Sequence, residues 1–396
     1  MDSLLNPFAP GAGTPPPQLA GRNELLNRLT VAIRRVALGR SARGALIVGL
    51  GGVGKTVLLD QFRTEAEALG HESVRIEAPE DRSLPALLAP YLRVTLLKLS
   101  RVERAREKAQ RALTALSGFV GALRVKYSDI EVGLDLPAEP GLADNGDLEH
   151  DLTALLTTVG EAAKASQRAV VLLFDELQYV EDEQLAALIV ALHRVAQRQL
   201  PVILVGAGLP QLRAKMGRAK SYAERLFEFP EIGALPRDAF VQALKTPIQD
   251  AGADITDQAV DRIFEETQGY AYFVQEWGKQ VWDVAPGPLI QLSDATAASE
   301  ITIASLDESF FLVRFDRCSP SERRYLRAMA NLGPGSHRSG DIAESLGRTV
   351  TTLAPTRNNL IQKGMVWSPS HGDTAFTVPL FDEFLKRIMP GEDWRG

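Results

Sequence analysis

The strongest constraint on the fold is a glycine-rich loop near the start of the chain. Residues Gly49–Thr56 read G-L-G-G-V-G-K-T and fit the pattern G-x-x-x-x-G-K-[S/T], between an apolar run and a helical pattern from Val57 to Leu69. Glycines let backbone N–H groups turn inward around a phosphate, and the N-terminus of the following helix favours an anion. The loop therefore predicts a strand, a phosphate-binding turn and a helix in succession.

Each side chain of the loop has an expected role. Lys55 is expected to contact the β- and γ-phosphates of a nucleotide, and Thr56 to ligate Mg²⁺ through its hydroxyl oxygen. The alternative is a glycine-rich turn with an incidental Lys-Thr pair, which the flanking strand and helix patterns disfavour. The expected cofactors are thus ATP and Mg²⁺. The residues expected to bind the nucleotide are Gly49, Leu50, Gly51, Gly52, Val53, Gly54, Lys55, Thr56 and Val57.

Two adjacent acids form the second part of this candidate site. Asp175 and Glu176 follow the apolar run Val170–Phe174, and ligands of open α/β sheets bind at the carboxyl ends of the strands. Asp175 is expected to help hold the Mg²⁺, and Glu176 to orient and deprotonate an attacking water. An acidic pair that caps a helix is the alternative, which the nearby phosphate loop disfavours.

Alternation of strands and helices predicts an α/β fold. Strands separated by helices form a parallel sheet with helices on both faces. The run Val170–Phe174 is apolar throughout and suits a central strand, whereas Leu226–Phe229, interrupted by Glu228, suits an edge. The expected strands are Ala45–Val48, Ser73–Ile76, Val170–Phe174, Val202–Val205 and Leu226–Phe229.

Composition shifts divide the chain into three expected domains. An N-terminal arm and the nucleotide-binding domain occupy 1–233, a helical domain with its linker 234–311, and a winged helix-turn-helix 312–396. An insertion at about 84–147 separates the second and third strands, because that interval far exceeds a single crossover. Within it, Leu84–Leu116 is expected to be helical and Arg124–Leu136 to form a hairpin.

The wider pattern resembles a known family. The Gly49–Thr56 loop looks like a Walker A motif and Phe174-Asp175-Glu176 like a Walker B motif of AAA+ ATPases. With the segments below, the chain is similar to the Orc1/Cdc6-like and STAND-like ATPases, which implies an ATPase with a helical lid and a C-terminal winged helix. These segments are Leu19–Arg22, Val205–Pro210 and Gly269–Phe273.

The resemblance also bears on turnover and assembly. Arg225 stands where AAA+ proteins carry an arginine finger, which implies an oligomer; the alternative is a surface arginine paired with Glu224 or Glu228. The family's polar sensor after the fourth strand is replaced by Gly206-Ala207-Gly208, and the segment after Gly269 offers Gln275 and Lys279 but no arginine. We therefore expect slow hydrolysis that resets a switch.

The expected winged helix supplies candidate DNA contacts. Its first helix is Ser339–Gly347 and its second Thr351–Lys363, with Thr352 as N-cap so that Pro355 falls in the first turn. The exposed face of the second helix is expected to meet phosphates and base edges, although many winged helices bind protein instead. The residues expected to contact DNA are Arg348, Thr351, Arg357 and Lys363.

Composition leaves these alternatives open. A formal net charge of −6 gives no global footprint for nucleic acid. The basic run Lys98–Arg111 is a second candidate surface, but a solvated helix paired with Glu103 and Glu107 is favoured. A single cysteine, no signal peptide and no long apolar run indicate a cytoplasmic protein without a membrane span. A STAND-like regulatory ATPase that binds a protein partner is the main alternative function, and a small-molecule kinase is disfavoured.

Overall fold

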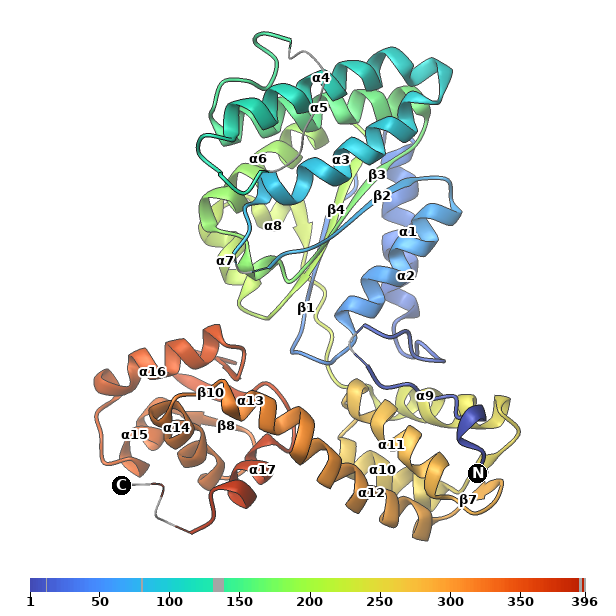
Figure 1. Ribbon diagram of the computed structural model, residues 1–396, viewed down its shortest axis with the longest axis vertical. Coiled ribbons are helices and arrows are strands. Elements are labelled where there is room, and N and C mark those ends of the chain that lie inside the picture. The colour runs from blue at the N-terminus through green and yellow to red at the C-terminus, as the bar shows by residue number, and fades with distance from the viewer. Residues whose placement is uncertain (12, 80, 131–138, 392–393, 395–396) are drawn as a thin grey trace. The chain divides into compact units, whose positions relative to one another are not determined.

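The computed structural model describes residues 1–396 except 12, 80, 131–138, 392–393 and 395–396 (Figure 1). The chain folds into two compact units. The sheet unit comprises Arg22–Gly49 and Lys55–Ile232, and the helical unit comprises Met1–Gly21, Leu50–Gly54 and Gly233–Gly396. Among the described helices, none is long and apolar enough to cross a membrane.

A five-stranded parallel sheet forms the centre of the sheet unit. Its strand order is β2-β3-β4-β1-β5, so the predicted parallel sheet is confirmed, with the third strand inside and the fifth at an edge. Every residue of β1, β3 and β4 is buried, as apolar parallel strands covered on both faces require. The strands are β1 (Gly44–Val48), β2 (Glu72–Glu77), β3 (Val170–Asp175), β4 (Val202–Gly208) and β5 (Phe227–Glu228).

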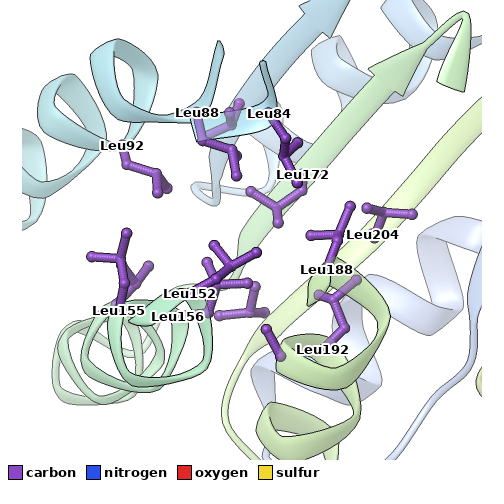
Figure 2. Close-up of a cluster of buried hydrophobic side chains, with 14 of the residues drawn as sticks. Leu84, Leu88, Leu92, Leu152, Leu155, Leu156, Leu172, Leu188, Leu192 and Leu204 are labelled. Atoms are coloured by element: carbon purple, nitrogen blue, oxygen red, sulfur yellow. The ribbon is translucent and has the colours of Figure 1, made fainter. Parts of the chain in front are cut away.

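Helices cover both faces of this sheet. α1 (Asn23–Ala37) and α2 (Lys55–Ala68) lie on one side, and α3 to α6 lie on the other (Figure 1). Leucines of α3, α5 and α6 interdigitate over those of β3 and β4 to form the main core (Figure 2). The remaining helices of this unit are α3 (Leu84–Ser100), α4 (Arg106–Leu123), α5 (Leu148–Ser166), α6 (Asp182–Gln197), α7 (Leu212–Ala219) and α8 (Ala223–Leu226).

The predicted insertion is largely helical. α3 and α4 occupy the stretch expected to be helical, with a break at the short 3₁₀ helix Glu103–Ala105. The hairpin expected over Arg124–Leu136 is wrong in its described part, because Arg124–Ile130 forms turns, and residues 131–138 lie outside the described residues. The alternating residues Tyr127 and Ile130 instead pack toward the core of α3 to α6, which satisfies them without a strand partner.

The first half of the helical unit is a helix bundle. The fully buried Trp277 donates a hydrogen bond to the hydroxyl of Ser299 at 2.9 Å, which fixes α11 against α12. A short parallel pair, β6 (Asp254–Ile255) with β7 (Leu289–Ile290), was not predicted. The helices are α9 (Arg237–Asp250), α10 (Asp257–Thr267), α11 (Ala271–Val284), α12 (Leu292–Leu306), a π-helical turn (Asp307–Phe311) and α13 (Leu312–Asp316).

The second half of the helical unit combines helices with a three-stranded antiparallel sheet of order β8-β10-β9. β8, with the polar sequence Ser-His-Arg, escaped prediction because it lacks the apolar alternation of a half-buried strand. The elements in chain order are α14 (Pro320–Asn331), β8 (Ser336–Arg338), α15 (Ser339–Ser345), α16 (Val350–Gln362), β9 (Val366–Trp367), β10 (Asp373–Phe376) and α17 (Phe381–Ile388).

The start of α16 differs from the prediction. Thr349, not Thr352, is the N-cap, and its hydroxyl accepts a hydrogen bond from the Thr352 N–H at 3.3 Å. Pro355 is therefore the sixth residue of the helix, beyond the first turn. The missing proline N–H leaves the carbonyl of Thr351 without its intrahelical donor, and Thr351 is exposed, so water can satisfy that oxygen.

Candidate active site

The phosphate loop joins the carboxyl end of β1 to the first residue of α2. Gly52 and Gly54 have φ values of 76° and 94°, the left-handed region that favours glycine. Lys55 is only 5% exposed, and its Nζ donates to the Gly49 carbonyl at 3.0 Å. Burial lowers the pKa of Lys55, and the carboxylates of Glu176 and Asp175 oppose that shift. The ammonium group thus lies inside the loop, beside the two acids.

Thr56 and Asp175, the two predicted metal ligands, are brought together. The Thr56 hydroxyl donates to Asp175 Oδ2 at 2.7 Å, and Asp175 is 1% exposed at the end of β3. A hydroxyl and a carboxylate are the hard oxygen ligands that Mg²⁺ prefers, so the pair fits this ion. No cluster of three or more His, Cys, Asp or Glu side chains fit for a metal occurs in the described parts of the chain. Mg²⁺ held by one or two protein side chains commonly completes its coordination with phosphate and water oxygens.

Arg75 is a residue of this site that the sequence analysis missed. From β2 its Nη2 donates to Asp175 Oδ2 at 3.0 Å, and its Nε pairs with Asp60 Oδ1 at 3.3 Å. The guanidinium compensates the charge of a carboxylate that is almost fully buried. The available signal was a charged residue within the predicted strand Ser73–Ile76, next to the strand that ends in two acids.

Glu176 occupies a strained position directly after β3. Its φ of 52° is left-handed, an uncommon conformation for a residue with a side chain. Its N–H donates to Asp175 Oδ1 at 3.0 Å, and its carboxylate accepts a hydrogen bond from the side-chain amide of Gln178. Gln178 was not predicted to belong to the site either.

The tip of the phosphate loop, Leu50–Gly54, belongs to the helical unit. There the Tyr270 hydroxyl donates to the Gly51 carbonyl at 2.5 Å, and the Tyr272 N–H donates to the Gly52 carbonyl at 3.1 Å. Burial raises the pKa of Tyr270 above its ordinary value, so its phenol stays protonated and remains a donor. A Cβ at Gly52 would overlap the Tyr270 ring, so this approach also requires glycine.

Arg225 lies at the opposite end of the sheet from these groups. It precedes β5, whose first residue Phe227 pairs with Gly44 at the start of β1, whereas the phosphate loop follows the end of β1. Arg225 is exposed and lines a cavity of about 610 Å³ with Arg43, His193 and Tyr222. Within the described chain no ion pair joins Arg225 to Glu224 or Glu228 (the partners that were the alternative).

The four predicted DNA contacts fall into two groups. Arg348 and Thr351 are exposed at the start of α16. Arg357 is not on the exposed face as expected, because its guanidinium donates to Thr374, to Ser368 and to the Asp373 carbonyl. Lys363 likewise binds the Glu322 carboxylate at 2.7 Å and the Arg317 carbonyl at 2.9 Å. Both cations therefore stabilise their own domain.

Two parts of the chain match models of protein families. Residues 18–205 match the model of the AAA ATPase domain, and residues 308–385 match a domain of unknown function (DUF8462). No functionally curated protein matches the sequence.

Solved structures are similar to this chain at low sequence identity. The Walker-type ATPase PABY2304 of Pyrococcus abyssi is 16% identical with a TM-score of 0.58, over 96% of this chain and 99% of that chain. The Thermotoga maritima RuvB Holliday junction branch migration motor is 16% identical with a TM-score of 0.45, over 94% and 96%. Aeropyrum pernix Orc1 in complex with DNA is 15% identical with a TM-score of 0.46, over 93% of each chain. The AAA ATPase match covers the phosphate loop, Asp175 at the end of β3 and Glu176 directly after it, so residues 18–205 of this chain form a P-loop ATPase domain of the AAA+ type.

Proposed function

We propose that the protein is a Mg²⁺-dependent ATP switch that assembles into homo-oligomers and binds duplex DNA through a C-terminal winged helix. Lys55 binds the β- and γ-phosphates, Thr56 and Asp175 hold Mg²⁺, and Glu176 accepts a proton from the attacking water. The hydrogen bonds of Thr56 and Glu176 to Asp175, and the electrostatic interaction of the buried Lys55 with both carboxylates, support these roles.

Slow turnover is part of this proposal. β4 ends in Gly206-Ala207-Gly208, which offers no side-chain donor to a phosphate. The segment after Gly269 contributes tyrosines rather than an arginine, and their hydrogen bonds to the loop tip support the helical domain 234–311 as the lid. Fewer charged donors stabilise less of the negative charge that develops in the transition state, so hydrolysis should reset a conformation rather than drive a fast motor.

The location of Arg225 carries the proposal of an oligomer. The five residues of β1 span about 16 Å, which separates Arg225 from the phosphate loop of its own chain. The exposed guanidinium of Arg225 has no carboxylate partner among the described residues and lies beside a cavity, so it is available to the nucleotide of a neighbouring subunit. We therefore assign Arg225 a role in trans.

Arg225→Ala should leave ATP affinity and thermal stability unchanged and lower turnover of the assembled protein by roughly tenfold, because the guanidinium acts on a neighbour's transition state. The decisive measurement mixes Arg225→Ala with Lys55→Ala subunits. Each variant is deficient alone, but a mixed assembly contains sites with an intact Lys55 from one subunit and an intact Arg225 from the next. Recovered ATP turnover supports action in trans, whereas turnover equal to the sum of the separate variants would contradict it.

Element order supports the winged-helix part of the proposal. Three helices and a three-stranded antiparallel sheet follow one another in the order expected of a winged helix-turn-helix: α14, β8, α15, α16, β9 and β10. In that motif the third helix, here α16, enters the major groove by its N-terminal residues. Arg348 and Thr351 are exposed there, beside the first turn of the helix.

Arg348→Ala should weaken binding of the full-length protein, with a non-hydrolysable ATP analogue, to duplex DNA. Because the contact is to phosphate, the slope of log affinity against log salt should flatten by about 0.9. Arg324→Ala, an exposed arginine of α14, is the matched control and should not change the slope. Absence of any salt-sensitive binding at low ionic strength would refute the DNA proposal.

A protein partner is the second candidate for this domain. It is favoured by the internal hydrogen bonds of Arg357 and Lys363, which leave fewer cations for phosphates than the sequence indicated. In that case, loss of Arg348 would leave DNA retention unchanged, and the protein would act as a STAND-like regulatory ATPase.

A further inference from the structure

Gln178 connects Glu176 to the end of β4. It belongs to the short 3₁₀ helix η3 (Leu177–Tyr179) and is 9% exposed. Its Nε2 donates to the Glu176 carboxylate, while its Oε1 accepts a hydrogen bond from the Leu209 N–H at 3.1 Å. Both ends of one buried amide are therefore satisfied, and the amide cannot rotate without losing one of these bonds.

Gly208 leaves the space that this amide occupies. A Cβ built on Gly208 would lie 2.5 Å from Gln178 Oε1 and 2.9 Å from Leu212 Cδ2, closer than real Cβ contacts. The backbone of Gly208 is an ordinary strand conformation, so φ does not require glycine there. The glycine is explained instead by the close approach of the Gln178 side chain.

The backbone around Gln178 is held as well. Lys215 on α7 donates from Nζ to the Gln178 carbonyl at 2.8 Å and pairs with Asp182 at 3.2 Å. These contacts fix η3 against α7, directly after the left-handed residue Glu176. Such a backbone conformation persists only where its surroundings hold it.

We propose that Gln178 is a positioning residue for hydrolysis, which orients the Glu176 carboxylate by holding one of its oxygens. The inference rests on the proposed role of Glu176 as the group that activates water. The amide holds one carboxylate oxygen and leaves the second to accept a proton from water. Gln178 thus links the Glu176 carboxylate to the backbone directly after β4. The end of β4 itself, Gly206-Ala207-Gly208, has no polar side chain.

The first test is Gln178→Ala in the full-length protein. Without the amide, the carboxylate of Glu176 samples several rotamers, so kcat should fall about tenfold. KM for ATP and the affinity for a fluorescent ADP analogue should stay within about twofold, because Gln178 orients a group that acts on water and not on the bound nucleotide. A residue that only stabilised the fold would instead change the thermal midpoint and nucleotide affinity together.

Gly208→Ala provides an independent second variant. The added Cβ should displace the amide and lower kcat to a similar extent, while Gly217→Ala on α7, whose Cβ would meet no atom within 4 Å, should retain wild-type kcat. Since both substitutions disrupt one hydrogen-bonded link, the double variant Gln178→Ala with Gly208→Ala should be no slower than the slower single variant. Multiplied losses would show that the two positions act separately.

Glu176→Gln, measured in parallel, separates failure of this inference from failure of the proposed function. If Glu176→Gln keeps full turnover, the assignment of Glu176 is wrong and the proposed mechanism fails. If Glu176→Gln is slow but Gln178→Ala has wild-type or higher kcat, or loses nucleotide affinity in step with kcat, the positioning role is overturned. If Gln178→Ala does not fold, the comparison of Gly208→Ala with Gly217→Ala decides by the same criteria.

Discussion

Glu176→Gln is expected to bind ATP with near wild-type affinity and to hydrolyse it about 100-fold more slowly, or slower still. The substitution keeps the size of the side chain and replaces only the basic oxygen that accepts a proton from water. Gln178 can donate its amide hydrogen to the new carbonyl oxygen as it does to the carboxylate, so the local geometry should survive. Steady-state release of phosphate gives kcat, and titration with a fluorescent nucleotide gives affinity.

Glu183→Gln is the matched control for this experiment. Glu183 is exposed on α6, where it pairs with Lys126 at 2.7 Å, and such a surface ion pair contributes little to stability. Its loss should leave kcat unchanged. Turnover of Glu176→Gln at the wild-type rate would assign the proton acceptor to another group.

The features of the fold that follow local sequence were predictable. β1, β3 and β4 are apolar runs buried on both faces. The G-x-x-x-x-G-K-T loop lies between β1 and α2, as expected for a glycine-rich turn that leads into a helix N-terminus. Lys55, Thr56, Asp175 and Glu176 converge because the carboxyl ends of parallel strands meet at one edge of a sheet. For these four residues, the location at a strand end or helix start could be predicted from the local sequence.

The residues that were missed depend on contacts between distant segments. Arg75 reaches Asp175 only because β2 pairs with β3. A charged residue within a predicted strand was a signal, but the sequence does not show which strand lies beside it. Gln178 matters through Leu209 and Gly208, which lie about a whole helix and strand further along the chain. Arg357 and Lys363 were predicted to be free to contact DNA, but both donate hydrogen bonds within the protein. Helical spacing does not reveal whether other elements of the domain supply acceptors for such side chains. The outcome for each such residue is decided by tertiary packing.

Lys55 combines local prediction with a tertiary effect. Its ammonium group is buried at the start of α2, where desolvation disfavours its charge while Glu176 and Asp175 favour it. The carbonyl of Gly49 accepts a hydrogen bond from it inside the loop. Phosphate oxygens bound in this loop would lie near two carboxylates. Besides the phosphate contact that we propose for it, the cation at Lys55 would then offset the repulsion between those acids and the nucleotide.

Lys55→Ala is therefore expected to weaken ATP binding by roughly 10- to 150-fold, the equivalent of about 1.5–3 kcal/mol for a hydrogen bond to a charged group. Titration with a fluorescent ATP analogue measures the change, and thermal unfolding checks that the fold persists. Lys164→Ala, an exposed lysine on α5, controls for the loss of one positive charge and should bind as the wild type does. The loss should be larger for ATP than for ADP. The negative γ-phosphate of ATP is expected to lie nearest to Asp175 and Glu176, so ATP depends most on the positive charge of Lys55 to offset this repulsion. Equal losses for both nucleotides would place Lys55 away from the γ-phosphate, and an ATP affinity within threefold of wild type would refute the site itself.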